Sequence, residues 1–510
     1  MALHISCLPD NVLTYIFEFL DNEERLNACL VCKDWLQTVN CHQLLWDIRL
    51  EFVEEIDGPA LIHMTRRFEQ FVFRNIAIDN FVIEFLSKYC RQMVKLTLID
   101  CNLHEECQFR FLNNILKCDN LNALYIRRSN VVPLFASLPK VTTLVLDLYD
   151  GMTDYVLCDL SRCLLKVERL VLFDLTADER IMTRPKKRRF NPEEICPLNF
   201  KFSFESVKKF IQKQSKTLKR LDLSNTGFSS DNVITISKIK DLKLDSIAFP
   251  PTTHALVVKE FCENQSSLTY VDFSVHYFMA NDAVRIVCKC LPNLKKLKFC
   301  APSDLNNSII EIFRLKHLSV LNLFGRTFIS ERIYREAFLN LKTNKLVYLN
   351  LAKSQISDDS LFKLLKFNPD IRTLILDKTK LSNKTLNMIC KNLIQIEKLS
   401  IAKCKAISDS GLTGEIECYS DSSTPTPLSN LKHLRFLNLS GNSLITNRGC
   451  MKAMKFLELE YLLLRGCDGL KLTKNFVSKL KGQNPRAKFF FNVIEENFDD
   501  SLYGHLQYAL

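Results

Sequence analysis

Apolar residues recur along most of the chain in a six-residue frame, with leucine or a similar residue at the first, fourth and sixth positions. An early frame begins at Met93 and continues through Leu96 and Leu98, and a late frame begins at Leu459. Such alternation over a short stretch predicts a strand that buries one side. Twelve further frames begin at Leu121, Val141, Val167, Leu218, Ile239, Leu268, Leu294, Leu318, Leu346, Ile371, Ile396 and Leu434.

The spacing of the frames is more informative than any single frame. Most successive frames begin 20 to 29 residues apart, which is the period of a leucine-rich repeat. The stretch after each strand has helical periodicity, most clearly in 357–365. One strand and one helix cannot bury their apolar faces alone, so neighbouring repeats must stack. The sequence therefore predicts an α/β fold, a leucine-rich-repeat solenoid with a curved parallel sheet and outer helices, of about 14 repeats across 79–491.

Two gaps in this period predict insertions near 176–200 and 413–430, where polar residues and prolines replace the apolar pattern. An amphipathic segment at 79–86 fits a leading helix, and 488–491 fits a closing strand. The acidic and aromatic residues 492–510 are then a C-terminal tail.

A second signature appears in the later repeats, most completely as Ile407-Ser408-Asp409-Ser410-Gly411-Leu412. It resembles the cysteine-containing class of leucine-rich repeats, which typically read Cys-x-x-(Leu/Ile)-(Ser/Thr)-Asp-x-Gly-Leu. Cys101, Cys404 and Cys467 fall where a small buried side chain turns the backbone out of the strand. We therefore expect these cysteines to have a packing role.

The chain before the repeats has a different pattern, in which Leu13, Ile16, Phe17 and Leu20 form one helical stripe. Pro9 suits the first turn of that helix, where its missing N–H is not needed. Two further helical segments follow, and both tryptophans of the chain lie among them. So small a bundle cannot bury all of these side chains. They predict either a docking surface for a partner or packing against the first repeat.

The same residues carry a family resemblance. Leu8-Pro9, then Val31-Cys32-Lys33-Asp34-Trp35, then Leu45-Trp46 resemble an F-box in order and spacing, over about 5–50. The resemblance implies a small all-α domain that binds the Skp adaptor, and through it a cullin and a RING protein. Together with the repeats, it implies an F-box/leucine-rich-repeat substrate receptor, with 51–78 as a helical linker. The adaptor-binding residues it implies are Leu8, Pro9, Leu13, Ile16, Phe17, Leu20, Val31, Trp35 and Trp46; some of these, Trp35 most obviously, can instead support internal packing.

The third and fifth residues of each frame should point from the concave sheet into solvent. In the late repeats, these positions hold large apolar residues that the core does not need, and such residues are natural interface anchors. Two alternatives stay open: strand propensity alone favours these residue types, and the tail can fold back over them. The target-binding residues predicted on this basis are Tyr348, Ile375, Phe436, Tyr461 and Leu463.

Several features bear on location. The N-terminus has no basic and apolar segments of a secretory signal, and no stretch of about 18 apolar residues could span a membrane. We therefore expect a cytoplasmic protein whose 20 cysteines are reduced thiols. The run Lys186, Lys187, Arg188 and Arg189 resembles a nuclear-import signal and predicts additional nuclear entry.

Composition and motifs give little support to catalysis. The chain has no phosphate-binding loop, dinucleotide fingerprint or nucleophile elbow, and its nine histidines are scattered. Cys29-x-x-Cys32 lacks a second pair at metal-site spacing, so we expect no metal and no cofactor. The net charge of +12 is spread along the chain rather than gathered into a stripe.

Three hypotheses follow. The leading one is a non-catalytic substrate receptor of an SCF-type ubiquitin ligase. The second is a binding scaffold whose F-box engages the adaptor without ligase output. The third, a binder of nucleic acid or an anionic ligand, fits less well because the charges on the concave positions alternate in sign.

Overall fold

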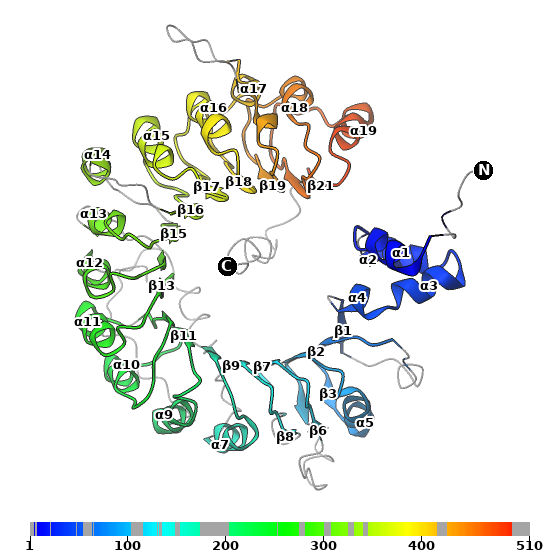
Figure 1. Ribbon diagram of the computed structural model, residues 1–510, viewed down its shortest axis with the longest axis vertical. Coiled ribbons are helices and arrows are strands. Elements are labelled where there is room, and N and C mark those ends of the chain that lie inside the picture. The colour runs from blue at the N-terminus through cyan, green and yellow to red at the C-terminus, as the bar shows by residue number, and fades with distance from the viewer. Residues whose placement is uncertain are drawn as a thin grey trace. The chain divides into compact units, whose positions relative to one another are not determined.

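The computed structural model describes residues 5, 8–20, 22–46, 48–54, 64, 66–103, 116–129, 131, 135–147, 154–173, 203–251, 253–274, 281–299, 308–324, 331–339, 345–415 and 426–491. The chain forms two compact units, Met1–Thr253 and His254–Leu510. In each unit, parallel strands form a sheet with helices along one side (Figure 1).

The first unit begins with a helical module and continues as a parallel sheet. The module's helices are α1 (Asp10–Phe17), α2 (Asn22–Cys29), α3 (Lys33–Val39) and α4 (His42–Leu45). The sheet strands, in spatial order, are β1 (Arg49–Val53), β2 (Gln70–Arg74), β4 (Lys95–Ile99), β7 (Ala123–Arg127), β9 (Thr143–Asp147), β10 (Arg169–Phe173), β11 (Arg220–Asn225) and β12 (Ser246–Ala248). Its covering helices are α5 (Asn80–Tyr89), α7 (Asp154–Cys163), α9 (Phe204–Lys213) and α10 (Ser230–Ser237). Short parallel pairs β3 (Ala77–Ile78) with β5 (Asn102–Leu103), and β6 (Leu116–Lys117) with β8 (Phe135–Ser137), line the outer side.

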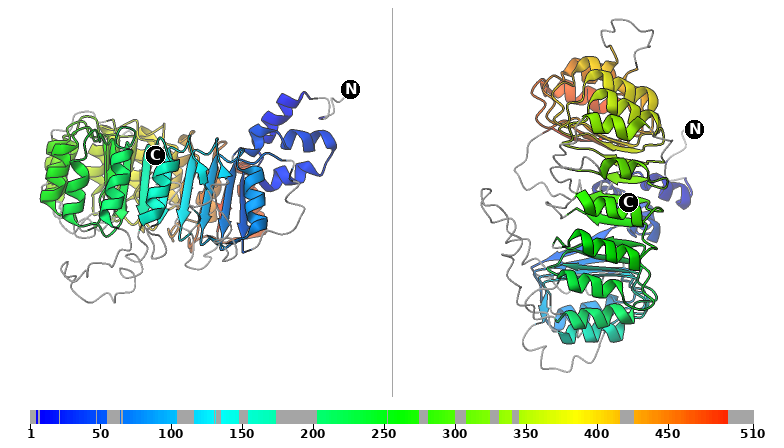
Figure 2. Two further views of the ribbon diagram at one scale, coloured as in Figure 1. Left: turned by 90° about the horizontal axis from the view of Figure 1, so that it is seen from below. Right: turned by 90° about the vertical axis from the view of Figure 1, so that its left-hand side faces the viewer.

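The second unit repeats the strand–helix pattern. Its strands, each paired in parallel with the next, are β13 (Tyr270–Phe273), β14 (Lys296–Phe299), β15 (Val320–Asn322), β16 (Tyr348–Asn350), β17 (Thr373–Ile375), β18 (Lys398–Ser400), β19 (Phe436–Asn438), β20 (Tyr461–Leu463) and β21 (Lys488–Phe490). Its helices are α11 (Ala255–Asn264), α12 (Asn281–Cys290), α13 (Ser308–Phe313), α14 (Glu331–Leu339), α15 (Asp358–Lys366), α16 (Asn383–Asn392), α17 (Asp409–Thr413), η5 (Leu428–Asn430), α18 (Asn447–Ala453) and α19 (Lys474–Gln483). Figure 2 shows these helices stacked along one side of the strands.

The predicted frame explains the core. In the frame that begins at Leu346, the first, fourth and sixth residues are fully buried between strand and helix. Cys101, Cys404 and Cys467 are buried as expected, and each thiol lies within hydrogen-bond distance of a main-chain carbonyl in the preceding repeat. The predicted fold class, a solenoid of parallel strands and outer helices behind a small helical module, is confirmed.

The helices predicted at 79–86 and 357–365 are α5 and α15, and each has a side-chain N-cap. Asp79 caps α5 by accepting from the Val82 N–H at 2.9 Å, and Ser357 caps α15 through the Ser360 N–H at 3.2 Å. The closing strand is β21. A hydroxyl or carboxylate at the N-cap satisfies donors that the first helical turn leaves unpaired.

Two sequence predictions were wrong. The frame at Ile239 lies in a turn, where Asp241 has φ +65°, and the strand of that repeat is β12, with Ile247 paired to Leu221. Apolar and polar residues alternate in 239–244 and also in 244–249, so this pattern alone could not place the strand. The segment 51–78 is not a helical linker in its described residues, because β1 and β2 already extend the sheet. Phenylalanine replaces leucine at buried Phe68, Phe71 and Phe73, which hid this frame.

Candidate protein-binding surfaces

The N-terminal helices pack around a small apolar core. Phe17, Ala28, Val39 and Leu44 are its buried members. Trp35 packs on Phe17 with ring centroids 5.1 Å apart in an edge-to-face arrangement. Edge-to-face contact adds to the burial of both rings, so Trp35 serves internal packing, the alternative role that the sequence left open.

A buried arginine ties the helix ends of this module together. Arg25 donates from Nε to the Phe17 carbonyl at 3.1 Å and from Nη1 to the Leu44 carbonyl at 2.9 Å. Its Nη2 reaches the Glu18 carbonyl at 3.4 Å. Carbonyls in the last turn of a helix lack intrahelical donors, and the rigid guanidinium supplies donors to two helices at once.

The module is attached directly to the first strands of the sheet. Nε2 of His42 lies 2.6 Å from Oε1 of Glu69, just before β2. Gln70 in β2 donates to the Trp46 carbonyl at 3.2 Å. These contacts join α4 and the residue after it to the start of β2.

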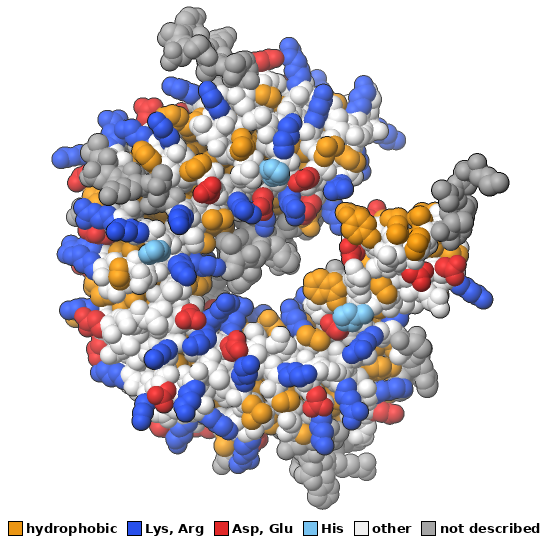
Figure 3. All heavy atoms as spheres, viewed as in Figure 1, with side chains coloured by type: hydrophobic (Ala, Val, Ile, Leu, Met, Phe, Trp, Pro, Cys, Tyr) orange, Lys and Arg blue, Asp and Glu red, His pale blue; other side chains and the backbone are white. Residues whose placement is uncertain are grey.

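Much of the module's apolar surface is exposed. Leu30 is 84% exposed, Val31 61%, Tyr15 61% and Phe19 58%. Figure 3 shows apolar side chains gathered over α1 and α2. Contiguous exposed apolar surface is uncommon on soluble proteins and marks interaction sites. Among the described residues of the module, the exposed large apolar residues are Ile5, Val12, Tyr15, Phe19, Leu26, Leu30, Val31, Leu36 and Trp46.

The structure divides the predicted adaptor-binding residues into three groups. Leu13 and Phe17 are buried, so they hold the helices rather than offer surface. Val31, Trp46 and Pro9 are exposed, while Leu8, Ile16, Leu20 and Trp35 are half-buried. The sequence reasoning missed Val12, Tyr15 and Phe19. They recur at helical spacing on the outer side of α1 and in the turn after it, where polar residues are usual.

The predicted target-binding residues do not point freely into solvent. Tyr348, Ile375, Phe436 and Leu463 are each less than 8% exposed, and Tyr461 is half-buried. Tyr348 and Ile375 form one cluster with Ala352, and Phe436 and Leu463 form another. Neighbouring strands lie about 4.8 Å apart, so large side chains on the same face, here at diagonal positions of adjacent strands, pack on one another. Burial raises the pKa of Tyr348 to about 12.

Asparagines at the fifth frame position are also structural. Asn322, Asn350 and Asn438 each accept, through Oδ1, from the N–H two residues later, at 3.1, 2.9 and 3.1 Å. Asp222 and Asp272 make the same contact in earlier repeats. A side chain that bonds its own backbone in this way ends a strand with a turn, so these acids are not free surface charges.

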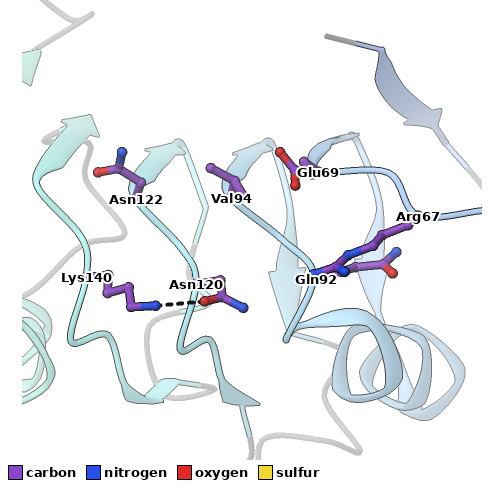
Figure 4. Close-up of a pocket in the computed structure, with 7 residues that line it drawn as sticks. All are labelled: Arg67, Glu69, Gln92, Val94, Asn120, Asn122 and Lys140. Atoms are coloured by element: carbon purple, nitrogen blue, oxygen red, sulfur yellow. Dashed lines mark hydrogen bonds between the residues drawn. The ribbon is translucent and has the colours of Figure 1, made fainter. Parts of the chain in front are cut away.

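A surface cavity of about 480 Å³ lies where successive strands of the first unit begin. Its residues come from the segments just before β2, β4, β7 and β9 and lie in a row (Figure 4): Arg67, Glu69, Gln92, Val94, Asn120, Asn122 and Lys140. Lys140 Nζ contacts Asn120 Oδ1 at 2.9 Å. Among the described residues, buried Nε2 of Gln92 has no hydrogen-bond partner. The cavity therefore offers donors suited to a carboxylate or carbonyl group.

Most cysteines in the described part of the chain are buried in the core. Cys32 is exposed and Cys29 half-buried, and no cluster of metal-ligating residues occurs among the described residues. Burial raises the pKa of Cys390 to about 12. A hydrogen bond from Cys118 lowers the pKa of Cys90 to about 7, but Cys90 is buried.

Other predicted features fall largely outside the described residues. These include the basic run Lys186–Arg189, the insertion near 176–200, most of the insertion near 413–430 and the tail 492–510. Over the residues that the structure describes, no helix is long and apolar enough to cross a membrane.

Comparisons with known proteins agree with this geometry. An F-box-like family model matches residues 5–48, which contain α1 to α4, and a leucine-rich-repeat model matches residues 430–452. No curated protein matches the chain.

Solved structures resemble the chain more distantly. One is the Rad7 and Elc1 complex in yeast, at TM-score 0.48 and 17% identity, over 68% of this chain and 80% of that chain. Another is the TLR13–ssRNA13 complex, at TM-score 0.45 and 14% identity, over 88% and 74% of the two chains. At TM-scores below 0.5, these similarities do not bear on function. The domain composition, an F-box-like domain followed by leucine-rich repeats, is that of an F-box/leucine-rich-repeat protein.

Proposed function

We propose that the chain is the substrate-recognition subunit of an SCF-type ubiquitin ligase. The F-box-like domain would bind the Skp adaptor, which links it to a cullin and a RING protein. The repeats would bind the protein to be ubiquitinated and degraded by the proteasome. The observation that supports this most strongly is the exposed apolar face on a domain that matches the F-box model.

The exposed face has the chemistry of a protein-docking surface. Leu30 and Val31 lie between α2 and α3 and contribute little to the module's own core. Burying one leucine against a partner stabilises a complex by about 1.5 to 3 kcal/mol. Tyr15 and Phe19 add an edge-to-face pair, with centroids 5.1 Å apart, on the same module. Such aromatic side chains are common anchors of protein interfaces.

In this proposal the chain does not catalyse ubiquitin transfer. Its partners would carry out the chemistry, and this chain would raise the local concentration of the target. It would act in the cytoplasm, and in the nucleus if Lys186–Arg189 serve as an import signal.

The adaptor contact can be tested without unfolding the domain. We expect the Leu30→Ala, Val31→Ala double variant to lower co-purification of the Skp adaptor by about tenfold or more, because both side chains are exposed in the free chain. Leu256→Ala with Leu457→Ala is the matched control, since both leucines are 78% exposed and lie in the repeats. Full retention of the adaptor by the double variant would contradict the proposed contact.

The alternative function is a scaffold that binds the adaptor without ligase output. To separate the two, partners are captured by the intact chain and by the double variant while degradation is blocked, and their lifetimes are then measured with degradation active. A receptor predicts bound proteins whose lifetimes lengthen when the adaptor contact is lost. A scaffold predicts the same bound proteins with unchanged lifetimes.

A further inference from the structure

The loops that follow strands β16, β17 and β18 hold a lysine at the same place. Lys353, Lys378 and Lys403 each occupy the eighth position of their frame and have φ of +65°, +57° and +57°. We call these three residues the lysine row. The next two repeats have Gly441 and Gly466 there, also at positive φ.

Lysine is energetically unfavourable at a position with positive φ. A left-handed backbone brings Cβ close to the following carbonyl, and only glycine avoids this crowding. Asparagine and aspartate tolerate it better because they can bond locally. At the equivalent positions of the first unit, Asn75 and Asp100 fit this preference, whereas Glu54 and Arg128 do not. Fold requirements alone therefore do not account for three successive lysines.

Main-chain hydrogen bonds hold the three lysines next to one another. The N–H of Lys353 donates to the carbonyl of Asp377, one residue before Lys378, at 2.7 Å. The N–H of Lys378 donates in the same way to the carbonyl of Ala402 at 2.8 Å, and that of Lys403 to Ser440 at 2.7 Å. With strands about 4.8 Å apart, the lysine row spans about 10 Å.

The loops that carry the lysine row (352–356, 377–381 and 402–406) contain five lysines and one acid, Asp377. Among the described residues, no acidic side chain forms an ion pair with Lys353 or Lys403. The buried acid beside Lys378, Asp377, accepts from the Ser400 hydroxyl at 2.6 Å and the Ala402 N–H at 2.7 Å. Lys380 and Lys405 are exposed in the same loops.

Positive and negative charges are paired at the equivalent edge of the first unit and at the opposite edge of the second unit's strands. In the first unit, the eighth positions hold Asp100 and Arg128, which pair at 2.6 Å. Where the strands of the second unit begin, Arg372 pairs with Glu397 at 3.1 Å, and Arg435 lies 3.7 Å from Glu460. The excess of positive charge is thus a local property of the loops after β16 to β18.

An aromatic ring and a glycine border the lysine row. Nζ of Lys353 lies 4.2 Å from the ring centroid of Phe324, which is 38% exposed. At the other end, a Cβ on Gly441 would come 2.7 Å from Cγ of Lys403, so glycine leaves room for that side chain. The row therefore combines cations with an accessible aromatic ring.

We infer that the lysine row binds a short segment of a protein partner that carries clustered negative charge, from acidic or phosphorylated residues. This inference rests on the proposed function, in which the repeats bind a target. Three lysines across about 10 Å match two or three anionic side chains beside one apolar residue. Nucleic-acid binding usually neutralises a longer run of phosphates, with about 6 to 10 contacts.

Fluorescence anisotropy with defined peptides on the full chain tests the inference. The probes are one labelled Gly/Ser peptide with three consecutive glutamates, one with three phosphoserines, one with three serines, and a single-stranded oligouridylate. The test variant is Lys353→Gln, Lys378→Gln, Lys403→Gln. The matched control is Lys363→Gln, Lys366→Gln, Lys391→Gln, which removes three exposed charges from α15 and α16 of the same repeats.

We expect at least one anionic peptide to bind the wild-type chain, and the test variant to bind it about tenfold more weakly. The control should change binding by less than about twofold. Binding of both anionic peptides indicates acidic recognition, and binding of the phosphoserine peptide alone indicates phosphate. Equal loss in both variants, no anionic peptide binding, or tighter binding of oligouridylate would each overturn the inference.

Two further measurements keep the outcome interpretable. Lys→Gly at the same three positions removes the charges while suiting the left-handed backbone, and its melting temperature shows whether any loss of binding accompanies unfolding. Adaptor co-purification should be unchanged in every lysine variant. If it is unchanged while the peptides fail to bind, the inference fails and the proposed function stands.

Discussion

The carboxylate of Asp409 accepts two hydrogen bonds from Thr446 of the next repeat, from the N–H at 2.8 Å and from the hydroxyl at 2.6 Å. Thr446 is the N-cap of α18, so one acid links the starts of α17 and α18. Asp358 makes the same pair of contacts with Ser382, the N-cap of α16. The (Ser/Thr)-Asp part of the repeat signature therefore connects neighbouring helices.

The hydrogen bonds between Asp409 and Thr446 explain why the signature contains a glycine. A Cβ on Gly449 would come 2.1 Å from Oδ1 of Asp409. We expect Gly449→Ala to destabilise the second unit by about 1 to 3 kcal/mol, because the carboxylate would have to leave Thr446. Gly482→Ala in α19 is the control: no atom lies within 4 Å of its added Cβ, and alanine favours helix. Urea unfolding of both variants measures the difference, and equal stability would contradict the proposed link.

Arg25 should determine the stability of the F-box-like domain. We expect Arg25→Met to destabilise it by about 2 to 4 kcal/mol, since buried helix-end carbonyls would lose their donors. Arg25→Lys should recover only part of this loss, because an ammonium cannot reproduce the guanidinium fork. Both tryptophans of the chain, Trp35 and Trp46, lie in this domain, so tryptophan fluorescence during urea unfolding reports on it alone. An unchanged urea midpoint in Arg25→Met would show that the hydrogen bonds of Arg25 are dispensable.

The sequence predicted the repeats because their signal is local. Alternation at Leu346, Leu349 and Leu351 follows from burial on one side of a strand, and a leucine frame records it directly. The frame failed where another residue type fills the same space, as Phe71 and Phe73 do in β2. It also failed at Ile239, where two overlapping alternations compete and only the pairing of Leu221 with Ile247 decides between them.

The candidate surfaces were harder to predict because exposure depends on neighbours. Tyr348 and Ile375 occupy outward-facing positions, yet they pack on each other across adjacent strands. Tyr15 and Leu30 are apolar and would pass for core residues, but the domain is too small to cover them. The lysine row was visible as a repeated eighth position; its significance depends on the positive φ and on charge balance in three dimensions.

Burial of Tyr348 predicts a specific weakness at alkaline pH. Its folded pKa of about 12 lies above the ordinary value of 10, because burial disfavours the phenolate. The corresponding stability is fully present below pH 10 and is lost as pH rises through 12. At pH 11 wild type should therefore have lost about 1 kcal/mol through this group. Tyr348→Phe should lack that loss, whereas Tyr15→Phe, at an exposed site, should behave as wild type; urea unfolding at pH 8 and pH 11 compares them.

The lysine row predicts a conflict between stability and binding. We expect Lys378→Gly to stabilise the second unit by up to about 1 kcal/mol, because glycine has no Cβ to crowd the left-handed backbone. Lys405→Gly is the control in an equivalent loop: Lys405 has no positive φ, so glycine there should be neutral or destabilising. Thermal unfolding measures both. A rise in melting temperature for Lys378→Gly, together with weaker binding of the anionic peptide, would show that lysine is kept at this position for its charge rather than for the fold. A lower melting temperature would mean that the lysine stem contributes packing that outweighs its backbone strain.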